Sequence, residues 1–261
     1  MIKVENYFKG KVMKNTLLLL TLITSFSMAD IIGGEINIGY YNHAPTGTTQ
    51  YQGDEINLED DLKWESEGDV FVKAYIEHPL PIIPNIKVGY TSFGHSGSGS
   101  VNKSFQFGGK SFNLNSNIDT QFDLKMYDLT LYYEILDNWV NLDLGLNVKY
   151  IDGLINVKGT DIISNKLINE SADFKVPVPM LYAKARFDVP ITDLSFQAEG
   201  NYVTYDGHTF YDAEIGARYT LALGLGLEAG YKTMKLELDD IEDLSMNAEF
   251  SGAYGKLVWD F

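Results

Sequence analysis

Cysteine is absent from the 261-residue chain. Its absence excludes a disulfide framework, a thiolate metal site, a cysteine-linked lipid anchor and a cysteine nucleophile. Apolar runs of the roughly 20 residues that a transmembrane helix needs are also missing, so a helical membrane protein is not expected. Basic charge is scarce, with 20 Lys and Arg against 36 Asp and Glu. Nucleic acid is therefore not an expected partner.

The N-terminal segment has the features of a secretory signal peptide. Lys14 supplies a positive charge, residues 16–26 a short apolar stretch, and Ser27-Met28-Ala29 a small-x-small cleavage site. We therefore expect two regions: residues 1–29 as an N-terminal extension plus signal peptide, with Met13 as the start, and residues 30–261 as one domain. An uncleaved membrane anchor on a periplasmic protein is the alternative interpretation.

Polar and apolar residues alternate in repeated segments of about ten residues, bounded by Gly, Asn, Asp or Pro. In residues 140–150 one face carries Asn, Asp, Gly, Asn and Lys, and the other is apolar and ends on Tyr150. Ten such segments are predicted as strands: 35–41, 70–77, 86–93, 122–134, 140–150, 180–188, 194–205, 211–219, 223–236 and 247–261. This predicts an all-β fold, a transmembrane antiparallel up-and-down β-barrel of about ten strands, with eight strands as the alternative.

The predicted connections alternate between short and long. Residues 78–85, 136–139, 189–193 and 220–222 are compact, whereas residues 44–69, 94–119, 153–176 and 238–246 are mostly longer and polar. Residues 206–208 are the short exception. Short periplasmic turns and longer extracellular loops are typical of outer-membrane barrels, and an even strand number places both chain ends on the periplasmic side.

Aromatic residues lie near the predicted strand ends. Rings that carry a polar atom favour the membrane interface, although tyrosine also suits strands by propensity alone. The membrane-interface residues that we expect are Tyr40, Tyr90, Tyr150, Tyr202, Tyr231, Trp259 and Phe261.

The last strand resembles the C-terminal signal by which the assembly machinery recognises outer-membrane barrels, because the chain ends on Phe261 with Leu257 and Trp259 on one face. The chain from residue 30 also resembles small, largely uncharacterised outer-membrane β-barrel proteins of proteobacteria, in residues 33–41 and in Pro45-x-Gly47. The resemblance implies an outer-membrane location in a Gram-negative cell envelope. It transfers no catalytic residue.

The inward faces of the predicted strands carry charges of both signs. The lumen-lining residues that we expect are Lys73, Asp128, Asp143, Lys149, Lys184, Arg186, Glu199, Glu214, Arg218 and Glu228. A barrel of this strand number has an interior that side chains largely fill. We therefore expect a largely plugged lumen, without cofactor or enzymatic activity, and a structural or surface-interaction role. A narrow, porin-like channel for small solutes is the alternative.

Two polar motifs suggest hydrolysis. Asp206-x-His208 resembles the omptin proteases, in which such a pair activates water. The second acidic pair of that family has no counterpart in residues 94–118, so an omptin-like surface hydrolase is only a second alternative. His95-Ser96 has the residue types of a lipid esterase, but the Gly- and Ser-rich composition around it is the simpler explanation.

Histidines and acidic residues at the rim are candidate metal ligands. His43, His95 and His208 would form a site if they converged, and the acidic residues within 54–67 and 239–243 would hold divalent cations that bridge to lipopolysaccharide. A solvated acidic rim is the favoured interpretation, and we expect no metal site. The expected partners are outer-membrane lipid and lipopolysaccharide, the assembly machinery through the C-terminal strand, and, as an option, divalent cations at the acidic loops.

Overall fold

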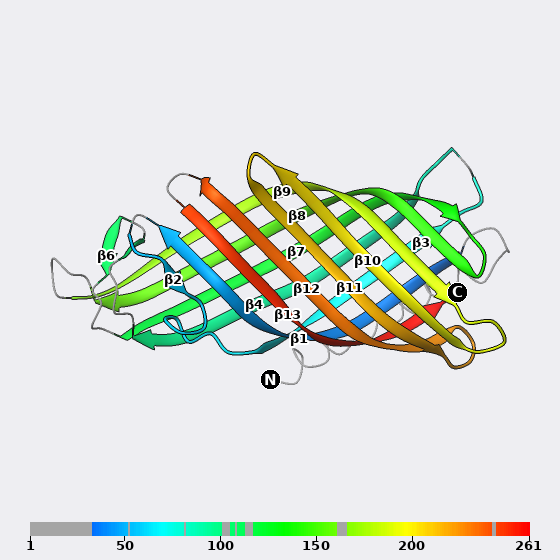
Figure 1. Ribbon diagram of the computed structural model, residues 1–261, viewed down its shortest axis with the longest axis horizontal. Coiled ribbons are helices and arrows are strands. Elements are labelled where there is room, and N and C mark those ends of the chain that lie inside the picture. Colours follow the sequence, from blue (N-terminus) through cyan, green and yellow to red (C-terminus); the bar gives the residue numbers. More distant parts are fainter. Residues whose placement is uncertain are drawn as a thin grey trace, which may run out of the picture.

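A computed structural model describes residues 33–51, 53–80, 82–100, 105–107, 109–112, 117–160, 166–241 and 244–261. These residues form a closed antiparallel barrel of ten long strands (Figure 1). The predicted signal peptide, its cleavage site and the start at Met13 lie outside the described residues. Within the described part of the chain, no helix is long and apolar enough to cross a membrane.

The wall strands are long. They are β1 (Gly33–Tyr51), β3 (Glu67–Glu77), β4 (Asn85–Ser100), β7 (Asn117–Leu136), β8 (Val140–Thr160), β9 (Leu167–Asp188), β10 (Leu194–Tyr205), β11 (His208–Thr220), β12 (Leu225–Ile241) and β13 (Leu244–Asp260). Three short strands belong to connections: β2 (Ile56–Asn57) pairs with β1, and β5 (Phe105–Phe107) pairs with β6 (Lys110–Phe112).

Neighbouring wall strands in sequence are neighbours in space, and β13 pairs with β1 to close the ring. The predicted all-β, ten-stranded antiparallel barrel is therefore confirmed, and the eight-stranded alternative is wrong. Each of the ten predicted segments lies within a different wall strand, apart from Leu223, Gly224 and Phe261 at segment ends. Closure leaves no wall strand with an unpaired edge.

The strands are staggered around the ring. We traced directly paired residues once around the ring, starting with Thr46 of β1 and its partner Glu249 of β13. The path returns to β1 at Gly34, twelve residues from the start. A stagger of this kind tilts the strands of a closed barrel by roughly 35–45° from its axis. Figure 1 shows the strands crossing the long axis of the barrel obliquely.

The two ends of the barrel differ in their connections. At one end, which we call the turn end, residues 78–84, 137–139, 189–193 and 221–224 join the strands. β1 begins and β13 ends at the turn end, as an even strand number requires. The other end, which we call the loop end, holds the connections 52–66, 101–116, 161–166, 206–207 and 242–243. Connections 52–66 and 101–116 are longer than any at the turn end, but 206–207 and 242–243 have two residues each, so the predicted alternation of short and long connections is present only in part.

The predicted loop lengths are wrong, because the strands continue further toward the loop end. β1 reaches Tyr51, β4 reaches Ser100, β9 already begins at Leu167 and β12 reaches Ile241. Much of the segments 44–69, 94–119, 153–176 and 238–246 is therefore strand. The strands are predicted from the alternation of polar and apolar residues, and this alternation ends where the outward face becomes polar. Backbone hydrogen bonds between strands continue beyond that point, because they form whether the side chains are polar or apolar.

Candidate functional site in the barrel interior

The outward wall is apolar over the half of the barrel toward the turn end. Leu131, Leu146 and Leu181 are ladder neighbours on three adjacent strands, and each is 44–64% exposed. The predicted interface residues Tyr40, Tyr150, Tyr202, Tyr231 and Phe261 are also exposed, and Tyr90 and Trp259 are partly buried. Beyond this apolar band the outward residues become polar, for example Asn42, Ser92 and Lys235.

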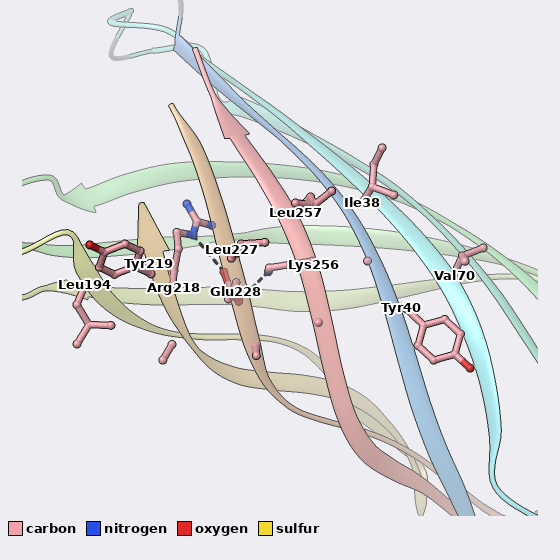
Figure 2. A pocket seen from close by; sticks show the side chains of 14 residues that line it. Ile38, Tyr40, Val70, Leu194, Arg218, Tyr219, Leu227, Glu228, Lys256 and Leu257 are labelled. Carbon is pink, nitrogen blue, oxygen red and sulfur yellow. Dashed lines mark hydrogen bonds and ion pairs between the residues drawn. The ribbon is translucent and has the colours of Figure 1, made fainter. Parts of the chain in front are cut away.

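A shallow groove hollows the apolar band (Figure 2). Ala217, Ala229 and Gly255 are ladder neighbours on β11, β12 and β13, and their small size leaves a volume of about 640 Å³ beside Tyr219 and Leu257. The outward lining is almost wholly apolar. The groove is therefore suited to contact with lipid acyl chains, and apart from the tyrosine hydroxyls its outward lining offers no side chain that could act as an acid, a base or a nucleophile.

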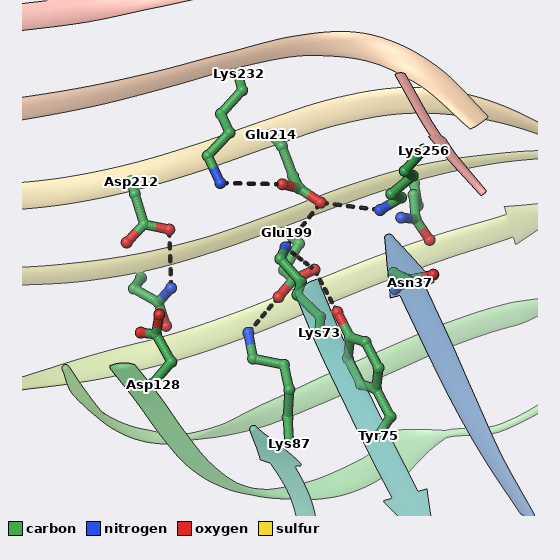
Figure 3. Close-up of polar contacts among 12 residues, drawn as sticks. Asn37, Lys73, Tyr75, Lys87, Asp128, Glu199, Asp212, Glu214, Lys232 and Lys256 are labelled. Atoms are coloured by element: carbon green, nitrogen blue, oxygen red, sulfur yellow. Dashed lines mark hydrogen bonds and ion pairs between the residues drawn. The ribbon is translucent and has the colours of Figure 1, made fainter. Parts of the chain in front are cut away.

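Charged side chains from several strands meet inside the barrel (Figure 3). Glu214 of β11 is their centre: its Oε1 lies 2.9 Å from Lys73 Nζ and 3.1 Å from Lys256 Nζ, and its Oε2 lies 3.5 Å from Lys232 Nζ. Lys73 also lies 3.1 Å from Glu199 Oε2. One carboxylate thus holds three ammonium groups from three other strands.

Glu199 of β10 is a second centre of the same network. It pairs with Lys87 as well as Lys73, and the Tyr75 hydroxyl donates to its Oε2 at 2.8 Å. Lys149 forms a further group, with its Nζ 2.7 Å from Asp128 Oδ1 and 3.1 Å from Asp212 Oδ2. Asp128 and Lys149 are ladder partners on the neighbouring strands β7 and β8, whereas the contacts of Glu199 with Lys73 and of Lys149 with Asp212 cross the interior between strands that are not neighbours in the wall.

Arg218 organises the charges nearest the turn end. Its Nη1 lies 2.8 Å from Glu35 Oε2 and 3.5 Å from Asp260 Oδ1, and its Nε lies 3.1 Å from Glu228 Oε2. Lys256 links this group to the rest through a 2.9 Å contact with Glu228 Oε1. We call the whole set the ionic layer; its members are Glu35, Lys73, Lys87, Asp128, Lys149, Glu199, Asp212, Glu214, Arg218, Glu228, Lys232, Lys256 and Asp260.

Strand register explains why these charges pair. Glu214 lies opposite Lys232, Arg218 opposite Glu228 and Glu228 opposite Lys256 in the β11–β12–β13 ladder. Facing residues have Cβ atoms about 4.5–5.5 Å apart, so opposite charges at these positions meet without distortion.

The structure places the ten predicted lumen-lining residues on the inward faces. Asp143, Lys149, Lys184, Glu199, Glu214, Arg218 and Glu228 are buried, and Lys73, Asp128 and Arg186 are partly exposed. Sequence reasoning missed the inward tyrosines Tyr41, Tyr75, Tyr132 and Tyr254, because their type alone does not separate them from the outward ones. Their position in the alternation is the signal that identifies them, because Tyr41, Tyr75, Tyr132 and Tyr254 are in step with the inward charges Glu35, Lys73, Asp128 and Lys256 of their own strands.

Two of the buried charges stand outside the ionic layer. Asp143 and Lys184 are ladder partners and are 4% and 7% exposed, yet among the described residues neither has an ion pair within 4 Å. Lys184 Nζ instead lies 4.4 Å from the centre of the Tyr75 ring. On the same strands, the Tyr182 hydroxyl and Asn141 Oδ1 have no protein partner. Water is the natural partner for such groups.

The interior becomes apolar toward the loop end. Tyr41, Phe71, Phe93, Phe122 and Phe250 are each at most 5% exposed and belong to one cluster. We call this cluster the aromatic layer. It lies between the ionic layer and the mouth of the barrel, so two layers of different chemistry fill the lumen in series.

The connection between β1 and β3 folds into the mouth over the aromatic layer. We call its residues 53–66 the cap segment. Leu58, Leu62 and Trp64 of the cap segment are 0%, 6% and 7% exposed, and Trp64 Nε1 donates to Thr120 Oγ1 at 2.7 Å. The Trp64 ring stacks on Phe122 with 5.6 Å between centroids.

Alternate glycines of β4 make room for the cap segment. A Cβ on Gly97 would lie 2.3 Å from the Leu62 carbonyl oxygen, and one on Gly99 would lie 1.8 Å from the Asp61 carbonyl oxygen. A residue with a side chain would push the cap segment away. The Gly-Ser alternation of residues 96–99 thus has a structural reason: Gly97 and Gly99 face the cap segment, and Ser96 and Ser98 face outward.

Two histidines of the aromatic layer are hydrogen-bonded to each other. His43 Nδ1 lies 2.9 Å from His95 Nε2, and His43 Nε2 lies 3.2 Å from Asp69 Oδ2. His95 Nδ1 lies 3.2 Å from the Glu65 carbonyl oxygen in the cap segment. His95 is five residues beyond Tyr90, outside the apolar band, and burial followed by the neighbouring His43 lowers its pKa to about 4.

His208 does not join His43 and His95 in a metal site. Its Nδ1 accepts a hydrogen bond from the Asp239 backbone N–H at 3.1 Å. In the described part of the chain, no group of three His, Cys, Asp or Glu residues is arranged to hold a metal ion. The convergence of three histidines is therefore wrong for these residues, because two belong to the interior and the third to a hairpin at the rim.

The two candidate hydrolytic motifs have backbone explanations. Asp206 and Gly207 have φ values of 51° and 85° and form the two-residue turn between β10 and β11, for which Asp-Gly is a preferred pair. His95 and Ser96 are consecutive in β4, so they point to opposite faces of the wall. The esterase pair is therefore wrong.

The acidic residues of the cap segment are engaged locally. Asn57 Oδ1 accepts the backbone N–H groups of Glu59 at 2.9 Å and Asp60 at 2.7 Å, and Asp61 Oδ2 accepts the Asn57 N–H at 2.8 Å. These bonds shape a turn, as Asn and Asp side chains commonly do. Among these bonds, the Asp61 carboxylate is the acidic side chain that has a structural role.

Ten closed antiparallel strands, an apolar exterior bordered by tyrosines and a charged interior define the fold of an outer-membrane β-barrel. No family model matches the chain, and no curated protein sequence matches it.

Several solved structures resemble the chain at low identity. The translocator domain of the autotransporter NalP from Neisseria meningitidis has a TM-score of 0.44 and 11% identity, with 98% of each chain covered. Ail, the attachment invasion locus protein of Yersinia pestis, has a TM-score of 0.35 and 12% identity, covering 87% of this chain and 99% of that one. A FadL homologue of Pseudomonas aeruginosa has a TM-score of 0.31 and 8% identity, covering 89% and 90%.

Proposed function

We propose that the chain is a non-enzymatic barrel of a Gram-negative outer membrane, with a closed lumen and a structural or surface-interaction role in the cell envelope. The apolar band supports the membrane address, because leucines such as Leu146 and Leu181 are exposed in ladder positions. Exposed apolar surface of this extent is unfavourable in water and favourable in lipid.

The succession of ionic layer, aromatic layer and cap segment carries the proposal of a closed lumen. Lys256 and Arg218 have side chains with no solvent exposure, and Glu199 and Glu214 have 2%. A hydrated conducting path would leave such charges in water. Instead they are paired with each other, which offsets the several kcal/mol that burying each ion costs.

Planar-bilayer recording tests the closed lumen. We expect the purified wild-type protein to give no unitary currents. A variant in which Lys73, Glu199, Glu214 and Lys256 of the ionic layer and Phe71, Phe93, Phe122 and Phe250 of the aromatic layer are changed to Ala, with cap residues 56–64 replaced by a short Gly-Ser linker, should conduct. Flotation of both proteins with liposomes shows that each has inserted. Reproducible unitary currents from the wild-type protein would contradict the proposal.

A narrow channel is the second candidate, and the region of Asp143 and Lys184 favours it. Asp143 and Lys184 are buried and have no ion pair among the described residues. The Tyr182 hydroxyl and Asn141 Oδ1 on the same strands have no protein partner, so water along β8 and β9 would satisfy all four groups. If that hydrated path conducts, Lys184→Ala and Asp143→Ala should change ion selectivity in opposite directions.

The partners follow from the same proposal. Lipid and lipopolysaccharide would contact the apolar band and the loop end, and the acidic residues of the cap segment would attract divalent cations. The strand that ends on Phe261 would be recognised by the outer-membrane assembly machinery. Exchange of Trp259 and Phe261 for Ser tests this last point, and we expect loss of the heat-modifiable form from isolated outer membranes.

A further inference from the structure

Asp69, His43, His95 and the Glu65 carbonyl form one continuous chain of contacts through three wall strands and the cap segment. The three contacts are Asp69 Oδ2 to His43 Nε2, His43 Nδ1 to His95 Nε2, and His95 Nδ1 to the Glu65 oxygen. Both imidazoles are shielded, with exposed fractions of 0% and 2%. Water therefore does not substitute for any of these contacts.

Counting protons shows what the chain of contacts requires. A carboxylate and a backbone carbonyl are acceptors only, so His43 Nε2 and His95 Nδ1 must each carry a hydrogen. The nitrogen–nitrogen contact between the rings needs one hydrogen as well. Two neutral imidazoles supply two hydrogens in total. The three contacts are therefore complete only when the pair carries one additional proton.

We propose that His43 and His95 share a single imidazolium proton, and that this proton latches the cap segment to the barrel wall. The added charge is balanced by the carboxylate of Asp69, which also accepts the Gly94 backbone N–H at 2.8 Å. Glu65 supplies the contact that lies on the cap segment, so the latch joins cap and wall directly.

The surroundings single out Asp69 as the charge that faces the pair. From β1 the Tyr41 ring lies 4.6 Å from His43, and its hydroxyl donates to backbone carbonyls. From β4 and β13, Phe93 and Phe250 stack on the two imidazoles at 4.4 and 5.0 Å between centroids. From the cap segment, Trp64 stacks on His95 at 5.5 Å. Asp69 of β3 is thus the ionised group in contact with the pair, and Glu67, the ladder partner of His43 in the same phase of β3, is a second acidic residue beside it.

The latch should weaken on both sides of an intermediate pH range. Loss of the shared proton leaves one contact with two acceptors facing each other. Gain of a second proton places two N–H groups against each other between the rings, and the lowered pKa of His95, about 4, sets this acid limit. The cap segment is consequently held most firmly when the His43–His95 pair carries one proton more than two neutral rings.

Nitrogen-15 NMR of histidine-labelled protein in detergent micelles tests the proton count. At the pH where the cap segment is most protected, we expect one imidazolium and one neutral ring at His43 and His95, with coupling across the nitrogen–nitrogen hydrogen bond. His208→Gln and His78→Gln variants assign the remaining signals. Two neutral rings at that pH would overturn the proposal.

Acrylamide quenching of Trp64 tests the coupling to the cap segment. In a background with Trp139→Phe and Trp259→Phe, quenching should be lowest at intermediate pH and rise roughly tenfold toward either side, as expected for loss of a charge-assisted hydrogen bond. In His95→Gln the amide N–H donates to the Glu65 carbonyl and the amide oxygen accepts from His43 Nδ1, so His43 still has to carry the extra proton but no second proton is taken up. The acid rise should disappear while the alkaline rise remains. Quenching that stays independent of pH in the wild-type background would also overturn the proposal.

Asp69→Asn gives a second, opposite test. An amide nitrogen in the place of Oδ2 is able to donate to His43 Nε2, so two neutral rings then complete the three contacts of the chain, with loss of the Gly94 N–H bond to the same atom. The alkaline rise of quenching should disappear while the acid rise remains. An unchanged alkaline rise would show that the proton on the pair does not hold the cap segment.

Discussion

Arg218 and Glu228 face each other across β11 and β12, and the 3.1 Å contact between Nε and Oε2 joins two side chains that solvent does not reach. Each has further partners, since Arg218 also contacts Glu35, and Glu228 accepts from Tyr254 at 2.6 Å and Gln197 at 2.9 Å. A pair so placed stabilises the barrel as long as both members are present. Removal of Arg218 leaves the buried carboxylates of Glu35 and Glu228 with one cation fewer.

Arg218→Met should therefore destabilise the barrel strongly. Loss of one partner of a buried ion pair costs about 3–5 kcal/mol. The free energy of unfolding in urea, followed by tryptophan fluorescence and by gel mobility without heating, measures the change. Lys175→Met is the matched control, because the Lys175–Asp152 pair is exposed and such pairs contribute about 0–1 kcal/mol. Equal effects of the two substitutions would contradict the structural role of Arg218.

Gly97→Val should displace the cap segment, whereas Ser96→Val should not. The two positions are consecutive in β4, but a side chain on Gly97 would overlap the Leu62 carbonyl oxygen, and Ser96 is on the outward, exposed face. Trypsin cleavage after Lys63 at neutral pH reports the displacement. We expect fast cleavage in the Gly97 variant and wild-type resistance in the Ser96 variant. Resistance in both would show that the cap segment does not depend on the close approach.

Leu146→Arg should oppose insertion into lipid bilayers. Leu146 is 64% exposed in the apolar band, and an arginine facing lipid near the bilayer midplane costs about 2–4 kcal/mol. The folding equilibrium into phospholipid vesicles measures this cost. Gln121→Arg, on an exposed outward position beyond the band, is the control and should have little effect. If both variants insert as well as wild type, the apolar band is not the lipid-facing surface.

Acid should remove stability that the neutral form of His95 contributes. Its pKa in the folded protein, about 4, is below the ordinary value near 6.5, so the unfolded chain binds the proton first as the pH falls. The contribution is complete above pH 6.5 and is lost as the pH falls toward 4. The urea-unfolding free energy of wild type should therefore decrease more than that of His95→Gln between pH 7 and 4.5. His208→Gln should behave as wild type.

The strand count and the inward charges were predictable because both follow from alternation of period two. Lys73, Glu199 and Glu214 each occupy the polar phase of a segment whose other phase is apolar, and the structure places all three inside. The pairing partners were not predictable. Glu214 meets Lys73 only because the ring closes with a particular stagger, which depends on every ladder at once.

The loop-end interior was not predicted for a different reason. The cap segment carries Leu58, Leu62 and Trp64 among many acidic residues, and its composition favours a solvated loop. Its burial depends on space left by Gly97 and Gly99 on a strand more than 30 residues away. The composition of the cap segment does not show which distant residues it packs against. Alternate glycines in a strand do indicate that another backbone approaches that strand closely.

The seam between β1 and β13 brings the beginning and the end of the barrel sequence into direct contact. Gly34 N donates to the Phe261 carbonyl at 3.0 Å, and Phe261 N donates to the Gly34 carbonyl at 2.9 Å. A circular permutant that links these ends and opens the chain at the 206–207 turn would retain every interstrand ladder. Such a permutant would move Trp259 and Phe261 from the C-terminus to the middle of the polypeptide. Comparison of its refolding in detergent with its assembly in cells would separate the stability of the closed ring from the effect of the order in which the strands are synthesised.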